Sequence, residues 1–155
     1  MPGLEWIIAA IFIVVCAAAT IFIPRIRRQR MASKLAQARK LFQQRREWLE
    51  AKFVTLASSS GKPRGLAWVD CDFDNATTFA RDRSTGELHA FVGVLISFEA
   101  IEGGGMEDVE AVGNVRAATA VFRYAGTEWQ TDGRAIFNLN PTEAIEHFQQ
   151  LETVD

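Results

Sequence analysis

The strongest pattern along the chain is an apolar run from Leu4 to Ile23 that carries a single charge, Glu5. A helix rises about 1.5 Å per residue, so a run of this length spans roughly 30 Å, the thickness of a bilayer's hydrocarbon core. The run is apolar on every face, which excludes an amphipathic core helix. We therefore predict a transmembrane anchor over residues 1–24.

A cleaved signal peptide is the alternative for this apolar run. Signal peptides place positive charge ahead of a shorter apolar stretch. In this chain the first Lys or Arg is Arg25, which follows the run. The order of charge and apolar residues therefore favours the anchor.

A second helical pattern covers residues 25–57. Its apolar stripe is roughly 60° wide at 100° per residue and consists of Met31, Leu35, Ala38, Phe42, Leu49, Phe53 and Leu56. Three arrangements compete: a short coiled coil with an acidic partner, a helix lying on the membrane, and packing of the C-terminal half, around Trp48, on the chain's own sheet. A cation attracts lipid only within about 8 Å of the surface. We therefore favour a split, with the first turns on lipid and the last turns on the domain.

Beyond a linker at residues 58–63, the pattern changes to that of β-strands. Alternation over residues 65–73 predicts one strand face made of Ala67, Val69, Cys71 and Phe73. Further strands are expected at 77–81, 87–101, 114–124 and 128–139, with the last one broken at Thr131-Asp132-Gly133. The residues between the second and third strands, 82–86, suit a hairpin turn in which Gly86 takes a positive φ.

The third strand is apolar on both faces from Leu88 to Ile96, which predicts a central strand, bent or bulged near Gly93. A final helix is predicted from Asn140-Pro141-Thr142-Glu143, an N-cap followed by Pro and Glu, through Ile145, Phe148 and Leu151. The fold class is thus α+β: a transmembrane helix, a basic amphipathic helix, and an antiparallel sheet of about five strands with a C-terminal helix in domain 64–155. This layout resembles NTF2-like domains, several of which follow a membrane anchor.

Charge is unevenly distributed and gives the anchor a direction. Residues 25–46 hold nine Lys or Arg and no Asp or Glu, whereas residues 47–155 have a formal charge of −10. The positive-inside rule places the N-terminus outside and the domain in the cytoplasm, behind the cell (inner) membrane. We expect contact with anionic lipid headgroups and the membrane surface at Trp6, Arg25, Arg27, Arg28, Arg30 and Lys34. The acidic domain argues against nucleic acid as a ligand.

The most acidic stretch of the chain is also rich in glycine. The sequence Glu102-Gly103-Gly104-Gly105-Met106-Glu107-Asp108 places acidic residues at both ends, which would repel phosphate. We predict instead a docking surface for a basic segment, from a partner protein or from the chain's own helix. Its candidate residues are Glu102, Glu107, Asp108 and Glu110.

Residue types that carry catalysis or bind metals are sparse. Residues 70–75 are rich in Asp, but Asn75 stands where a calcium loop needs Gly, and Arg81 where it needs Glu. The carboxylates of this stretch are expected on a solvent face, opposite Arg81 or Arg83 of the neighbouring strand. With two histidines and two unpaired cysteines, no nucleophile set, zinc site, disulfide framework or cofactor is predicted.

Two functional hypotheses follow from these patterns. The first is a non-enzymatic, single-span accessory or adaptor protein whose cytoplasmic domain binds another protein of a membrane complex. The second, implied by the NTF2-like resemblance, is a tethered domain that binds or converts a small molecule in a cavity. Trp68, Trp129, Phe122 and Tyr124 are expected in the core, so a deep pocket lined by His89 and the tryptophans would favour the second hypothesis.

Overall fold

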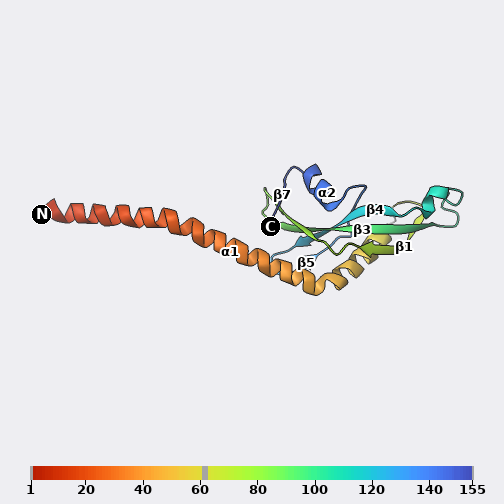
Figure 1. The fold of residues 1–155 in the computed structure, drawn as a ribbon, viewed down its shortest axis with the longest axis horizontal. Helices are drawn as coiled ribbons and strands as arrows, with labels where there is room; N and C mark the ends of the chain where they lie inside the picture. The colour runs from red at the N-terminus through yellow and green to blue at the C-terminus, as the bar shows by residue number, and fades with distance from the viewer. Residues whose placement is uncertain (1, 61–62, 155) are drawn as a thin grey trace. The chain divides into compact units, whose positions relative to one another are not determined.

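The structure, a computed structural model, describes residues 2–60 and 63–154, without the side chains of residues 2, 4 and 5. The chain divides into two compact units, Met1–Lys40 and Leu41–Asp155. Helix α1 (Pro2–Ser59) supplies the whole described part of the first unit and the first element of the second, and it continues through Pro24 (Figure 1). The linker expected at 58–63 starts later than predicted, because Ser58 and Ser59 are helical; Gly61 and Lys62 lie outside the described residues.

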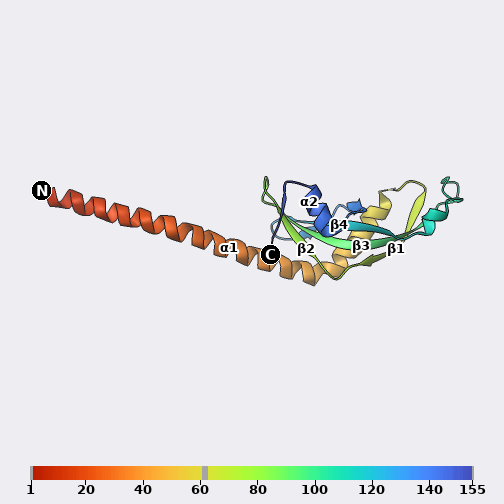
Figure 2. The ribbon, with the colours of Figure 1, turned by 45° about the horizontal axis from the view of Figure 1, so that its top comes forward.

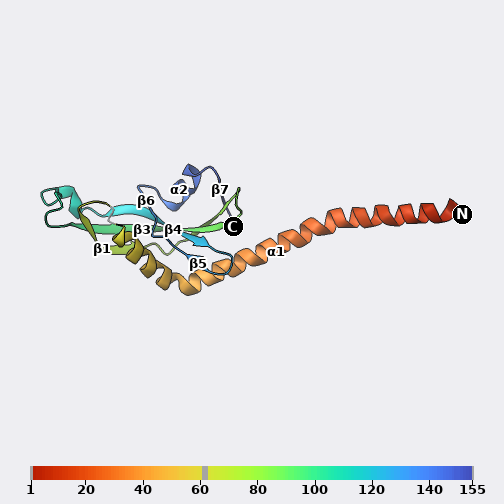
Figure 3. The same ribbon diagram turned by 180° about the vertical axis from the view of Figure 1, so that it is seen from behind.

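The second unit contains an antiparallel sheet of seven strands rather than about five. In chain order the strands are β1 (Leu66–Phe73), β2 (Thr78–Asp82), β3 (Leu88–Ala100), β4 (Arg116–Tyr124), β5 (Trp129–Gln130), β6 (Ala135–Phe137) and β7 (Leu151–Thr153). The spatial order is β5-β4-β3-β2-β7, with β1 also paired to β3 and β6 to β4. The strand expected at 128–139 is therefore two short strands, β5 and β6, which follow the outer side of β4 one after the other (Figure 3).

Strand β3 is the central strand, as its two apolar faces predict. Its pairing with β4 runs in unbroken register from Leu88 opposite Tyr124 through Gly93 opposite Thr119. On its other side β3 pairs first with β2 and then with β1, so these two strands lie at opposite ends of β3 (Figure 2). The register with β4 thus has no bulge at Gly93, and the partner strand on the other side of β3 changes near this residue.

The hairpin expected around residues 82–86 is confirmed. The Oδ1 atom of Asp82 accepts hydrogen bonds from the N–H groups of Ser84 and Thr85 at 2.7 and 3.0 Å. Gly86 has a φ of +74°, which L side chains rarely adopt. Together the Asp side chain and the glycine determine the turn between β2 and β3.

One face of the sheet is covered by the part of α1 that follows Lys40. Phe42, Leu49 and Phe53 are completely buried there. The ring of Phe42 lies 5.4 Å from that of Phe122 and 5.0 Å from that of Trp129, measured between centroids. The last turns of α1 therefore pack on the domain as the split arrangement expects. Trp48 is an exception: it is 53% exposed, so its expected place against the sheet is wrong.

The opposite face is covered by a short helix, α2 (Pro141–His147), as Figure 1 shows. The predicted capping box is present: Asn140 Oδ1 accepts from Glu143 N, and Asn140 N donates to Glu143 Oε2, both at 2.9 Å. Ala144 and Ile145 pack with Ala80 and Phe91. The helix ends sooner than predicted, because Phe148 is extended and Leu151 pairs with Asp82 of β2.

Ala67 and Val69 of β1 do not lie on the inner face of the strand as expected, and strand pairing explains why. An irregularity between Trp68 and Asp70 shifts the register, so Trp68 turns inward and Val69 is 55% exposed. Ala67 is exposed as well, whereas Cys71 and Phe73 remain half-buried.

The carboxylates of β1 also have a different neighbour from the one expected. Asp70 and Asp72 lie opposite Ser97 and Leu95 of β3 rather than beside β2. Arg83, expected to pair with one of these carboxylates, lies 3.3 Å from Glu152 instead.

Candidate functional site: an apolar pocket beside an acidic loop

The N-terminal part of α1 contains a segment long and apolar enough to cross a membrane, and none of its most apolar window is buried. Core helices of soluble proteins and signal sequences also meet this criterion of length and composition. Trp6 is 77% exposed. The other residues expected at the membrane surface are exposed on the same helix, namely Arg25, Arg27, Arg28, Arg30 and Lys34.

Among the more distal cations, Arg46 is bound by the domain itself. Its Nε lies 2.7 Å from Glu50 Oε1, one turn further along α1. Its Nη1 donates to the carbonyl of Asn75 at 2.6 Å, and Nη2 donates to the carbonyl of Asp74. Arg46 therefore joins α1 to the segment between β1 and β2, rather than serving a lipid or a separate acidic partner.

The four acidic candidates lie in the loop between β3 and β4, which includes the short helix η1 (Glu110–Gly113). Glu102, Asp108 and Glu110 are exposed. Glu107 is exposed as well, and its carboxylate accepts a hydrogen bond from the N–H of Gly103. The backbone N–H groups of Glu107 and Gly103 lower the pKa of this carboxyl. All four acids thus present their charge to solvent, and one of them, Glu107, also orders the loop.

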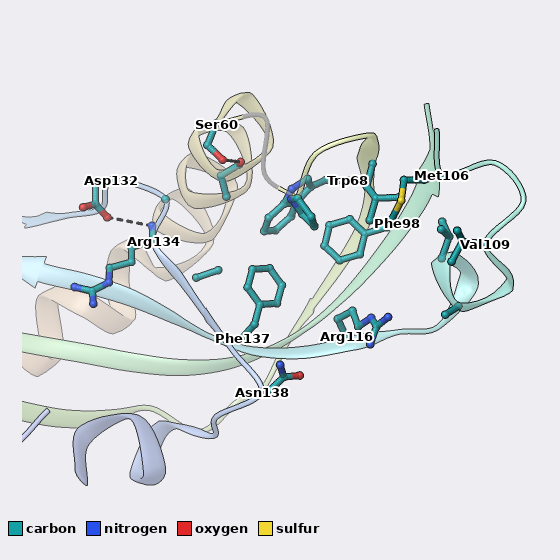
Figure 4. A pocket seen from close by; sticks show the side chains of 17 residues that line it. Ser60, Trp68, Phe98, Met106, Val109, Arg116, Asp132, Arg134, Phe137 and Asn138 are labelled. Carbon is teal, nitrogen blue, oxygen red and sulfur yellow. Dashed lines mark hydrogen bonds between the residues drawn. The ribbon is translucent and has the colours of Figure 1, made fainter. Parts of the chain in front are cut away.

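The same loop forms one wall of a cavity of about 840 Å³ (Figure 4). Met106, Val109 and Val112 line it from the loop, whereas Trp68, Phe98 and Phe137 line it from the sheet. The three rings contact one another: the Trp68 ring lies 5.4 Å from Phe98 and 6.4 Å from Phe137 between centroids. Trp68 reaches this position because of the irregularity at Val69.

Polar groups lie around the aromatic floor of the pocket rather than in it. Arg116, at the start of β4, is exposed and lines the pocket together with Asn138. The side chain of Arg134 points away from the rings (Figure 4). The hydroxyl of Ser60 donates to the carbonyl of Ala57 at 2.6 Å. The arrangement suits an apolar group with polar or charged atoms left at the entrance.

His89 and the tryptophans do not share a pocket. His89 lines a second cavity of about 690 Å³, on the face that carries α2. Trp129 and Phe122 are buried in the core, as predicted, but Trp68 lines the apolar pocket. The sequence did not reveal this pocket, because neither the irregularity in β1 nor the fold of the loop has a signal in the hydrophobic pattern.

Metal ligation is not indicated within residues 2–60 and 63–154, where no three His, Cys, Asp or Glu side chains are grouped to hold an ion. Comparisons with protein-family models, with curated proteins and with solved structures find no match to this chain. The NTF2-like layout therefore stays a prediction.

Proposed function

We propose that the protein is a single-span membrane protein whose cytoplasmic α+β domain binds a segment of another membrane protein. The observation that carries this proposal is that one loop supplies both the apolar wall of the pocket, through Met106 and Val109, and four exposed carboxylates. A segment with an apolar side chain flanked by Lys or Arg would be complementary to both features. Apolar anchors in pockets supply most of the affinity of such interfaces, while charges at the rim steer association.

The experiment compares two matched charge variants of the full-length chain, purified from its native membrane in mild detergent. The triple variant E102Q/D108N/E110Q removes three of the four exposed carboxylates of the loop and keeps Glu107, which orders it, and E47Q/D72N/E146Q removes equal charge from exposed sites elsewhere. We expect membrane subunits to co-purify in fixed ratio with the wild type and the second variant, and to be lost from the loop variant. Equal recovery with both variants would contradict the proposal.

A small molecule in the pocket is the second candidate, supported by one feature. A volume of about 840 Å³ lies within the range of small-molecule sites, roughly 300–1,000 Å³. Organic extraction and mass spectrometry of the same wild-type preparation distinguish the candidates. A retained apolar compound, displaced by the substitution M106E and unaccompanied by protein subunits, would favour this second function over the first.

A further inference from the structure

The second cavity, on the face of the sheet that carries α2, differs in character from the apolar pocket. It is lined by a cluster of nitrogen and oxygen donors that the proposed function does not use. These donors are His89 from β3, Arg123 from β4, Gln130 and Thr131 from β5 and the residue after it, and Arg134 from the segment before β6.

Strand pairing brings the first two donors together. His89 lies directly opposite Arg123 in the antiparallel register of β3 and β4, so both side chains project from the same face. The guanidinium of Arg134 lies 5.0 Å from the centre of the Phe148 ring, and both residues line this cavity. Two guanidinium groups and an imidazole therefore border one space.

Three carboxylates, those of Asp82, Glu87 and Asp132, also border this space, so an anion has to bind directly at the guanidinium groups rather than in a positive field. Asp82 accepts from the N–H and hydroxyl of Ser84 and from the N–H of Thr85. Asp132 accepts from the backbone N–H of Arg134 at 3.1 Å. Glu87 lies 3.9 Å from Arg123, but both side chains are about half exposed, and such surface pairs contribute little.

A negative charge added near the imidazole of His89 would raise its pKa. Burial lowers the pKa of His89, and the nearby Arg123 and Arg134 lower it further, whereas Glu87 and Asp82 raise it. The lowered pKa favours the neutral ring at neutral pH. An anion bound between the guanidinium groups would stabilise the protonated ring and give it a donor role.

We propose that this cavity binds a small molecule through an oxyanion, a phosphate or a carboxylate, held between Arg123 and Arg134 with His89 as a third donor. The cavity shares Asp132 and Arg134 with the lining of the apolar pocket but includes no residue of the acidic loop, so the proposal stands whether or not a protein binds at that loop. Arginine suits this role because its planar donors match the oxygens of both groups.

The test uses the two histidines of the chain, His89 and His147, as paired reporters. The full-length protein is labelled with ¹³C at the histidine side chains and kept in a maltoside detergent, which contains no phosphate. Inorganic phosphate, sodium acetate and sodium chloride are titrated at equal ionic strength. We expect phosphate or acetate to shift the His89 resonances saturably and to raise its pKa, while the exposed His147 stays unchanged.

Variants locate the binding group. R123Q and R134Q should each weaken the phosphate or acetate response by about tenfold, since each removes a charged hydrogen-bond donor. R83Q, which alters an exposed arginine on the adjacent hairpin, should leave the response unchanged. A stronger response to short-chain phosphatidic acid than to inorganic phosphate would identify a lipid headgroup as the source. The site is refuted by an equal response to chloride, by parallel shifts of both histidines, or by wild-type binding in R123Q and R134Q.

Discussion

Burial raises the pKa of the Cys71 thiol to about 11, and the carboxylate of Asp70 adds to this effect. The thiolate is the reactive form of cysteine. At a given pH well below the pKa, each unit by which the pKa rises lowers the thiolate fraction about tenfold. In a C16S background, we expect iodoacetamide to modify Cys71 at pH 8 about a hundredfold more slowly than it modifies the same chain unfolded in urea. D70N should speed the folded reaction modestly. Equal rates in folded and unfolded chains would show that the thiol is not shielded.

His89 should make the stability of the protein depend on pH in the neutral range. Its folded-state pKa is lowered, chiefly by burial, so the unfolded chain takes up a proton more readily as the pH falls through about 6.5. Stability is therefore complete above that pH and declines below it. We expect the melting temperature in mild detergent without added anions to be lower at pH 5.5 than at pH 7.5. H89Q should reduce this difference, whereas H147Q should retain it; an unchanged difference in H89Q would assign the effect to other groups.

Among the elements, the connection between β5 and β6 makes a close approach to the last turns of α1. Gly133 has a φ of +77°, and a Cβ placed there would lie 2.6 Å from the backbone N of Ala57. Gly126 has a similar φ of +86° with open space around it. Both G133A and G126A incur a backbone strain of about 1–2 kcal/mol, but only G133A also overlaps α1. We expect a clearly larger loss of unfolding free energy for G133A, measured by urea titration. Equal losses for the two variants would mean that α1 shifts to accommodate the added methyl group without further loss of stability.

Helix α2 depends on its first turn, because it has only seven residues. The Asn140 side chain satisfies the N–H of Glu143, which has no partner within the helix. N140A should cost about 1 kcal/mol of stability and speed hydrogen exchange at Glu143 and Ala144. T142A, an exposed substitution in the same turn, should have a small effect. Equal destabilisation by the two variants would show that packing, rather than the cap, holds α2.

The elements also show how far the sequence alone could reach. The hairpin at 82–86, the central strand and the start of α2 were predictable, because local turn chemistry, two apolar faces and a capping box determine them. Leu151 follows Ile145 and Phe148 at helical spacing, yet it pairs with β2, since a free strand edge offers backbone hydrogen bonds that spacing does not report. Trp68 was misplaced for a similar reason: the irregularity that turns it into the pocket is a property of pairing with β3.

For the whole molecule, the separation of charge is the feature with the widest consequence. The nine cations of residues 25–46 directly follow the apolar run, and the acidic domain follows them. If the run spans a membrane, this order favours retention of the cations, and with them the domain, on the cytoplasmic side. The exposed carboxylates of the loop would then be available to cytoplasmic segments of neighbouring membrane proteins.

This orientation is tested with single cysteines in a C16S/C71S background. An impermeant maleimide applied to intact cells should label P2C, whereas S59C should react only after the membrane is permeabilised. Replacing Arg25, Arg27, Arg28 and Arg30 with Gln should let a fraction of the chains label at Ser59→Cys, because these cations lie nearest the apolar run. A matched replacement with Gln, far along the sequence, should leave S59C unlabelled in intact cells. It changes Arg64, Arg83, Arg116 and Arg123. Labelling of S59C in intact cells without these changes would contradict the predicted orientation. A mature chain that lacks the apolar run would identify the run as a cleaved signal peptide.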